Sequence, residues 1–372
     1  MNNATTNHSP IRGGARGGRL LSLDILRGMT VAGMIFVNNG YGESYEMFGH
    51  SEWNGMTPCD LVFPFFLFIM GVSTYLSLSK FNFEPSWPVV KKIMKRTFML
   101  FFLGVFIHWF DHAIWGDPMC FGHLRIWAVL QRIALCYCGC SLFAIFCNHK
   151  YTIPTIIGLL VLYSAILILG DGYAQDASVN ILAQVDLKLF GYEHLYHKSP
   201  VDPEGLVGTI SGIAHALIGF YLGKKLKEGD TTSKKMTSFF VVGTILVFAG
   251  YLLSYGLPLN KRIWSPSYVF MTCGLASLLQ ALLIYIIDIK GKVNWTKFFH
   301  IFGMNALALY VSSELLVILF WRFNIPPAIY SVVHTIIPPE QMASAAYALV
   351  IVMINFLLVG YPLWKKKIYV KL

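Results

Sequence analysis

Residues 20–70 read LLSLDILRGMTVAGMIFVNNGYGESYEMFGHSEWNGMTPCDLVFPFFLFIM and decide the fold class. They contain two apolar segments, each about the 20 residues that a helix needs to cross a bilayer, joined by a polar loop. Asp24 and Arg27 lie near the start of the first segment, Asn38 lies at its end, and Asp60 opens the second. Ionisable groups in or beside a membrane span are costly, so these residues are candidates for function.

The composition of the whole chain agrees with this pattern. Hydrophobic residues make up 56% of the 372 residues and charged residues 13%, whereas ordinary globular proteins have about 25% charged residues. Repeated apolar runs predict an all-α, polytopic helical membrane protein with about ten transmembrane helices. The expected spans are residues 20–39, 60–79, 91–110, 124–147, 152–170, 206–223, 236–256, 267–288, 298–320 and 344–364.

The positions of the basic residues predict the orientation. Lys and Arg gather in alternate connections, and the positive-inside rule places those connections in the cytoplasm. We therefore expect both termini in the cytoplasm, residues 1–19 as a disordered tail and residues 20–372 as one transmembrane domain. The net charge of +10 sits beside the spans, which indicates membrane lipid and not nucleic acid as a partner. The loops expected outside are 40–59, 111–123, 171–205, 257–266 and 321–343.

His50 is the first candidate for catalysis, because it lies in an outside loop just before Trp53-Asn54-Gly55. An imidazole suits a general base near neutral pH, although a loop histidine is also a common surface residue. Asn38 has an amide that suits an oxyanion, or it caps the helix end. Asp60 orients His50 or caps the second span. Trp53 and Asn54 are candidates for substrate contact.

Polar residues inside the spans suggest where a charged cofactor binds. Asp24 and Arg27 are three apart and share a helix face, which fits either a salt bridge or an arginine that receives a phosphate-bearing cofactor. Arg125 and Arg132 are seven apart, so they share a stripe that faces the bundle interior, and Gln131 adjoins them. Ion pairing would make these arginines structural, whereas contact with phosphate or sugar would make them functional.

Further candidates for substrate binding lie in the later outside loops. Asp202 and Glu204 end the longest loop, and Asn260 with Lys261 begins the stretch NKRIWSPSY. These residues suit a polar substrate, or they mark the outer membrane interface. Glu314 lies in the ninth expected span, where it needs a partner.

A metal site is an alternative for four residues near the third span, His108, Asp111, His112 and His123. His108 and His112 are four apart, which permits two ligands on one helix face. His112 lies beyond the expected end of the helix, and no recognisable motif surrounds the set. We therefore expect no metal.

The stretch SLDILRGMTVAGMIFVNN followed by GHSEWNGMTPCDLVFPFFLFIMG closely resembles the heparan-alpha-glucosaminide N-acetyltransferase family and its bacterial relatives. Four later stretches match in the same order: RIWAVLQRIALCY, VDPEGLVGTISGI, NKRIWSPSYV and GMNALALYVSSE. The resemblance implies that residues 20–372 form an acyltransferase domain. Its activity would move an acetyl group from cytoplasmic acetyl-CoA, the co-substrate, to the amino group of a glucosamine-type sugar beyond the membrane.

The resemblance also implies roles for single residues. The family's catalytic histidine precedes the WNG triplet and matches His50, and the asparagine near the acetyl end of the cofactor matches Asn38. The cofactor phosphates would then lie near Arg27 or Arg132. The chain lacks the large lumenal N-terminal region of the animal enzyme, so we expect a bacterial inner-membrane protein. Its acceptor need not be heparan sulfate, and a homodimer is compatible with the resemblance.

Two other functions compete with acetyl transfer. A sugar permease or exporter would also suit ten spans with a polar interior, and it would move sugar without acetyl-CoA. A scaffold protein that has lost catalysis is the third hypothesis, and the intact set of His50, Asn38 and Asp60 argues against it. The acetyltransferase is the function that the sequence favours.

Overall fold

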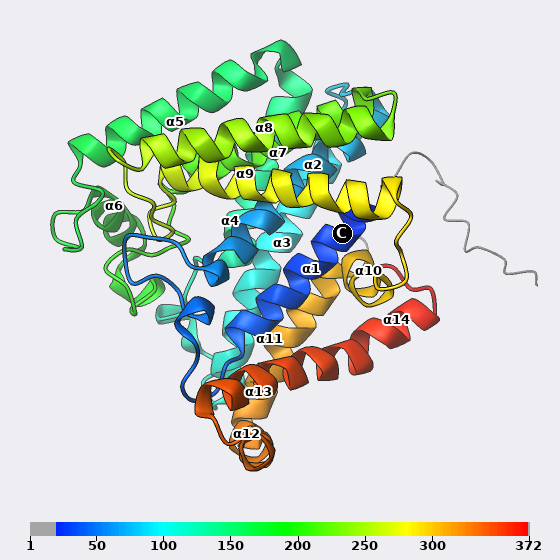
Figure 1. The fold of residues 1–372 in the computed structure, drawn as a ribbon. Helices are drawn as coiled ribbons and strands as arrows, with labels where there is room; N and C mark the ends of the chain where they lie inside the picture. Colours follow the sequence, from blue (N-terminus) through cyan, green and yellow to red (C-terminus); the bar gives the residue numbers. More distant parts are fainter. Residues whose placement is uncertain (1–19, 371–372) are drawn as a thin grey trace, which may run out of the picture.

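The computed structural model describes residues 20–370, and this part of the chain is helical and contains no strand (Figure 1). The expected tail 1–19 lies outside the described residues. The helices are α1 Leu21–Asn38, α2 Val62–Leu78, α3 Trp87–Ile114, α4 Val129–Phe146, α5 Thr152–Leu169, α6 Ile181–Phe190, α7 Thr209–Glu228, α8 Thr232–Leu253, α9 Pro266–Leu283, α10 Lys297–Met304, α11 Ala306–Arg322, α12 Ile325–Ile336, α13 Glu340–Asn355 and α14 Tyr361–Lys365.

Eight helical segments of the described chain are long and apolar enough to cross a membrane, and α10 with α11 would make a ninth. The prediction of a polytopic helical membrane protein is confirmed. The expected span 206–223 is α7, which is not among them although it has 20 residues. Its C-terminal turns carry lysines, and its centre is rich in small and polar residues. Because most of α7 is buried between other helices, it does not need an apolar surface.

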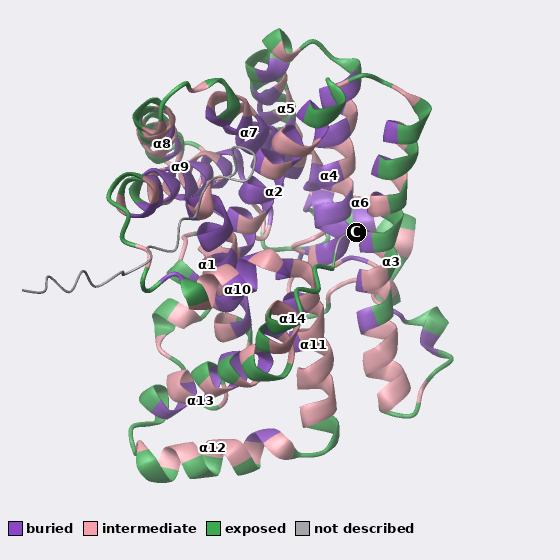
Figure 2. Cartoon of the chain, turned by 90° about the vertical axis from the view of Figure 1, so that its right-hand side faces the viewer, coloured by how far each residue is buried: buried purple, intermediate pink, exposed green. Residues whose placement is uncertain are grey.

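The helices that carry the polar residues lie in the middle of the bundle. α1, α2 and α7 are largely buried, whereas α8 and α5 expose most of their surface (Figure 2). The central helices pack with their backbones in close contact. A Cβ at Gly71 of α2 would lie 2.0 Å from the Ala216 carbonyl oxygen of α7. A Cβ at Gly28 of α1 would lie 1.8 Å from the Phe299 carbonyl oxygen of α10. Glycines at such contacts let membrane helices pack backbone to backbone.

The loops fall into two groups at opposite ends of the bundle, as alternating spans require. Loops expected outside are joined to one another by Lys261–Asp60, Trp53–Tyr173 and Arg322–Ile114 contacts. Connections expected inside also meet, since Lys227 Nζ donates to the Ser79 carbonyl and the Phe83 ring packs on His149. We use "outer end" and "inner end" for these two groups, with the names taken from the positive-inside rule.

The expected span 298–320 is not one continuous helix, because the chain bends by 87° between α10 and α11. Asn305 occupies the break with φ −126° and ψ 40°. Its side-chain amide donates to the Ile368 carbonyl at 3.0 Å and its oxygen accepts from the Val370 amide at 2.9 Å. The C-terminal segment therefore bonds the side chain at the break.

The orientation predicts which engineered cysteines react from outside the cell. Lys188 and Lys292 are both exposed, in an outer and an inner connection respectively. In a background lacking the exposed Cys147, Lys188→Cys should react with a membrane-impermeant maleimide in intact cells. Lys292→Cys should react only after the membrane is opened. The opposite pattern would show that the bundle is inverted.

Candidate active site

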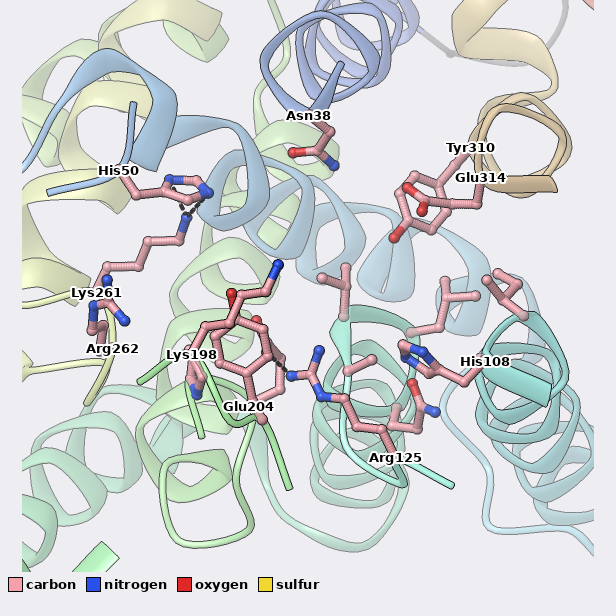
Figure 3. A pocket seen from close by; sticks show the side chains of 18 of the residues that line it. Asn38, His50, His108, Arg125, Lys198, Glu204, Lys261, Arg262, Tyr310 and Glu314 are labelled. Carbon is pink, nitrogen blue, oxygen red and sulfur yellow. Dashed lines mark hydrogen bonds and ion pairs between the residues drawn. The ribbon is translucent and has the colours of Figure 1, made fainter. Parts of the chain in front are cut away.

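A cavity of about 570 Å³ lies at the outer end of the bundle. Its wall is built by the end of α1, by α3, α4 and α11, and by four outer loops (Figure 3). Of the site residues expected from the sequence, the wall includes Asn38, His50, Arg125, Gln131 and Glu204. Residues as far apart in the chain as Asn38 and Glu314 therefore line one space.

His50 is held by Asp60. The side chain of Asp60 is 0% exposed, and it closes a capping box in the turn Pro58–Leu61. Its Oδ2 accepts from the amides of Thr57 and Ser51, each at 3.1 Å, while its Oδ1 accepts from His50 Nδ1 at 2.8 Å. A carboxylate only accepts, so this bond favours the tautomer with the proton on Nδ1, which leaves Nε2 as the basic nitrogen. Asp60 thus both caps the turn and orients His50.

Lys261 completes this cluster from a distant loop. Its Nζ lies 3.2 Å from Asp60 Oδ1. The same Nζ lies 3.0 Å from His50 Nδ1 and 3.4 Å from His50 Nε2, contacts that Figure 3 marks with dashed lines. A buried carboxylate needs a countercharge, and Lys261 supplies it. The sequence showed that Asp60 opens a span, but it did not show which of many lysines would reach it.

Asn38 reaches the cavity together with Glu314. The Glu314 carboxyl lies against the Asn38 amide and the Tyr310 hydroxyl, and all three residues line the wall. In Figure 3 they lie across the cavity from Lys261 and Arg262. The neighbouring Asn39 behaves differently, since its side chain donates to the Ile35 carbonyl at 2.7 Å. Asn38 faces the cavity, whereas Asn39 hydrogen-bonds a backbone carbonyl at the end of α1.

Arg125 ties the longest outer loop to the cavity wall. Its guanidinium donates to Glu204 Oε2 at 2.9 Å and to Asp202 Oδ1 at 3.2 Å, and it covers the Tyr196 ring at 4.5 Å. Asp202 is buried and also accepts from the Tyr196 amide. Arg125 and Glu204 therefore form the wall, while Asp202 stands behind it.

Asp186 supports the same loop, and the sequence did not single it out. Its Oδ1 accepts from the Leu206 amide at 3.0 Å. Burial raises the pKa of Asp186 to about 6, and the nearby Asp202 carboxylate acts in the same direction. This carboxyl is a structural support and does not line the cavity.

Gln131 and Arg132 are neighbours with different surroundings. Arg132 is 1% exposed, and its guanidinium donates to the carbonyls of Gly205 at 2.8 Å and Pro203 at 3.2 Å. Gln131 is fully buried on the cavity wall, and neither polar atom of its amide has a partner within residues 20–370. An unpaired buried amide is costly, so Gln131 marks a place where a bound molecule would supply hydrogen bonds.

Three residues expected to contact substrate instead join loops. Trp53 is buried and donates to the Tyr173 carbonyl at 3.0 Å. Asn54 accepts from the buried Asn260 at 3.2 Å. None of the three is on the cavity wall. The contacts that the structure gives them hold the outer loops together.

Asp24 and Arg27 lie apart from this cavity, toward the inner end of α1. Arg27 donates to Asp24 Oδ1 at 3.1 Å, to Ser73 Oγ at 2.8 Å and to the Gly303 carbonyl at 3.4 Å. Arg27 precedes Asn38 by eleven residues, which is ~16 Å along a helix. The structure therefore separates Arg27 from Arg132, which contacts the outer loop, so the two arginines do not share one phosphate site.

The four residues of the alternative metal site do not gather as one group, although His112 lies within α3 and not beyond its end. His108 lines the cavity, whereas His112 and His123 gather with Asp117 outside it. The sequence did not single out Asp117, because its approach depends on how the loop after α3 folds.

Comparison with known proteins identifies the relatives of this chain. Residues 19–202 match the family model described as heparan-alpha-glucosaminide N-acetyltransferase, catalytic. The heparan-alpha-glucosaminide N-acetyltransferase of Mus musculus is 29% identical over 411 aligned positions, covering 95% of this chain and 60% of the relative. The Homo sapiens protein of that name is 30% identical, covering 80% of this chain and 53% of the relative. The chain thus spans between half and three fifths of the length of these relatives. It belongs to the heparan-alpha-glucosaminide N-acetyltransferase family.

Proposed function

We propose that this chain is a transmembrane N-acetyltransferase that moves the acetyl group of cytoplasmic acetyl-CoA to an amino sugar, or a related envelope glycan, beyond the membrane. One observation carries the proposal: the oriented His50 and the Asn38 amide face the same cavity at the outer end. The names of the relatives support acetyl transfer as the reaction. The proposal places the protein in the cell inner membrane.

His50 acts as the base in this proposal. The acceptor nitrogen attacks the thioester carbon, the new C–N bond forms, and the C–S bond breaks to release the CoA thiol. His50 Nε2 takes a proton from the nitrogen and passes it to the departing sulfur. Asp60 keeps Nδ1 protonated and the ring in place, as a carboxylate does in a catalytic triad.

Asn38 supplies a hydrogen bond to the thioester oxygen as negative charge develops there. Such donors stabilise a transition state because they are already positioned before reaction. The contact with Glu314 restricts rotation of the Asn38 amide. Glu314 is therefore a positioning residue in this scheme, and it reaches Asn38 because α11 packs against α1.

Acetyl-CoA fits the residues present in two places. The cavity has the size of a single small-ligand site, and the unpaired Gln131 amide offers hydrogen bonds to a polar group. Arg27 is the candidate for the phosphates, because it lies toward the basic inner end. The ~16 Å between Arg27 and Asn38 along α1 is a distance that the long flexible arm of the co-substrate would bridge.

Replacing His50 tests the base directly. His50→Ala should lower turnover about 10²–10⁴-fold, the usual contribution of a general acid–base group. Binding of acetyl-CoA should change little, because the imidazole acts mainly in the transition state. The measurement is turnover per folded molecule with acetyl-CoA and glucosamine.

His197→Ala is the matched control, since His197 is an exposed histidine of another outer loop and bonds only the Tyr192 carbonyl and ring. It should keep the parent turnover. If His50→Ala also stayed within about threefold of the parent, His50 would have no part in the chemistry. Sugar flux without acetyl-CoA would then favour the permease.

Replacing Asn38 tests the oxyanion donor. Asn38→Ala should lower kcat about 10²–10³-fold, as loss of one oxyanion donor does. Asn38→Asp keeps the size of the side chain but removes the donor, so it should be at least as harmful. Full activity of Asn38→Asp would show that the residue only fills space.

Arg27 and Arg132 form a matched pair for locating the phosphates. A hydrogen bond to a charged group is worth about 1.5–3 kcal/mol, so Arg27→Gln should raise the Kd for acetyl-CoA by ~10–100-fold. Arg132→Gln should leave that Kd unchanged and lower the melting temperature, because it removes the hydrogen bonds that the guanidinium donates to the carbonyls of Pro203 and Gly205. Calorimetric titration of both variants decides, and weakened binding in Arg132→Gln alone would reverse the assignment.

A further inference from the structure

Three potential metal ligands gather on the connection between α3 and α4, outside the active-site cavity. They are His112, Asp117 and His123, and their ligand atoms all lie within 4.8 Å of one another. None of the three lines the cavity. Nothing in the proposed acetyl transfer uses them.

Two local turns bring these side chains together. His112 lies in the last turn of α3, and Gly116 follows with a φ of +98°, which a glycine adopts without strain. The Asp117 amide then donates to the His112 carbonyl at 3.0 Å, so the chain folds back over its own helix end. The Asp117 carboxylate is thereby carried to the side of His112.

A second turn returns His123 to the same place. Its amide donates to the Cys120 carbonyl at 3.0 Å, and the Cys120 side chain is fully buried. His123 Nε2 lies 2.8 Å from Asp117 Oδ2, and the rings of His123 and His112 have centroids 5.2 Å apart. Backbone hydrogen bonds therefore preorganise the cluster.

We propose that His112, Asp117 and His123 form a binding site for one divalent transition-metal ion such as Zn²⁺. Two imidazoles and one carboxylate suit Zn²⁺, which binds three protein ligands and a water at tetrahedral sites. Ca²⁺ and Mg²⁺ prefer shells of oxygen ligands and fit this donor set poorly. The half-exposed side chains of Asp117 and His123 leave room for a metal-bound water.

A metal here would cross-link the end of α3 to the arm that carries Arg125. His123 is two residues from Arg125, whose guanidinium holds Asp202 and Glu204 at the cavity wall. Binding of the ion to the folded chain alone would stabilise it by mass action. The inference concerns this arm and does not depend on the acetyl acceptor or on the reaction.

The test uses the full-length protein without a polyhistidine tag. It should bind one Zn²⁺ per chain by elemental analysis after dialysis, and Zn²⁺ should raise its melting temperature. Co²⁺ in place of Zn²⁺ should give the intense visible absorption of a tetrahedral site. His123→Ala and Asp117→Asn should each weaken Zn²⁺ binding by more than ~10-fold, the least that loss of an outer-shell partner costs.

His197→Ala is again the control, because this exposed histidine lies in another outer loop. It should bind Zn²⁺ as the parent does. Equal loss of binding in His197→Ala would indicate non-specific surface binding and overturn the proposal. So would a parent protein that binds less than one ion per chain at saturating Zn²⁺, since His123 and Asp117 would then form only an ion pair.

Discussion

The buried carboxylate of Asp60 is the constraint on which the outer end of the molecule depends. A charge without solvent contact is tolerated only when enough donors surround it. Here the donors come from Thr57 and Ser51 in its own loop, from His50, and from Lys261 in a loop some 200 residues later. Satisfying this one group therefore joins two outer loops and sets the orientation of the catalytic candidate at the same time.

The close packing of α1 and α2 gives this polar cluster a rigid base. Gly28 and Gly71 bring α1 and α2 into backbone contact with α10 and α7, so the ends of both helices have fixed positions. Asn38 ends α1 and Asp60 precedes α2. A site built where packed helices end is held more tightly than one built on loops alone.

The sequence predicted what depends on local pattern and missed what depends on tertiary contact. Span positions follow from apolar length. Asn38 stands out because it ends the first span, and His50 because it lies in the loop that follows. Lys261 and Glu314 come to the cavity through contacts between distant segments, which no local pattern reveals. The sequence predicts Arg125 and Arg132 on one helix stripe, and this is wrong because α4 begins only at Val129, so Arg125 lies in the non-helical chain before it. Only Arg125 lines the cavity, because Arg132 is covered by the carbonyls of residues 203 and 205.

The separation of Arg27 from Asn38 along α1 explains how transfer across a membrane is feasible in the proposed scheme. Arg27 lies toward the inner end and Asn38 at the outer end, so a phosphate and a thioester of one molecule can be held at different depths. Moving a charged group through the bundle would be costly. In this arrangement the nucleotide need not leave the inner side and the sugar need not leave the outer side. Only the neutral acetyl group changes partners, at the level of the cavity that Asn38 and His50 both line.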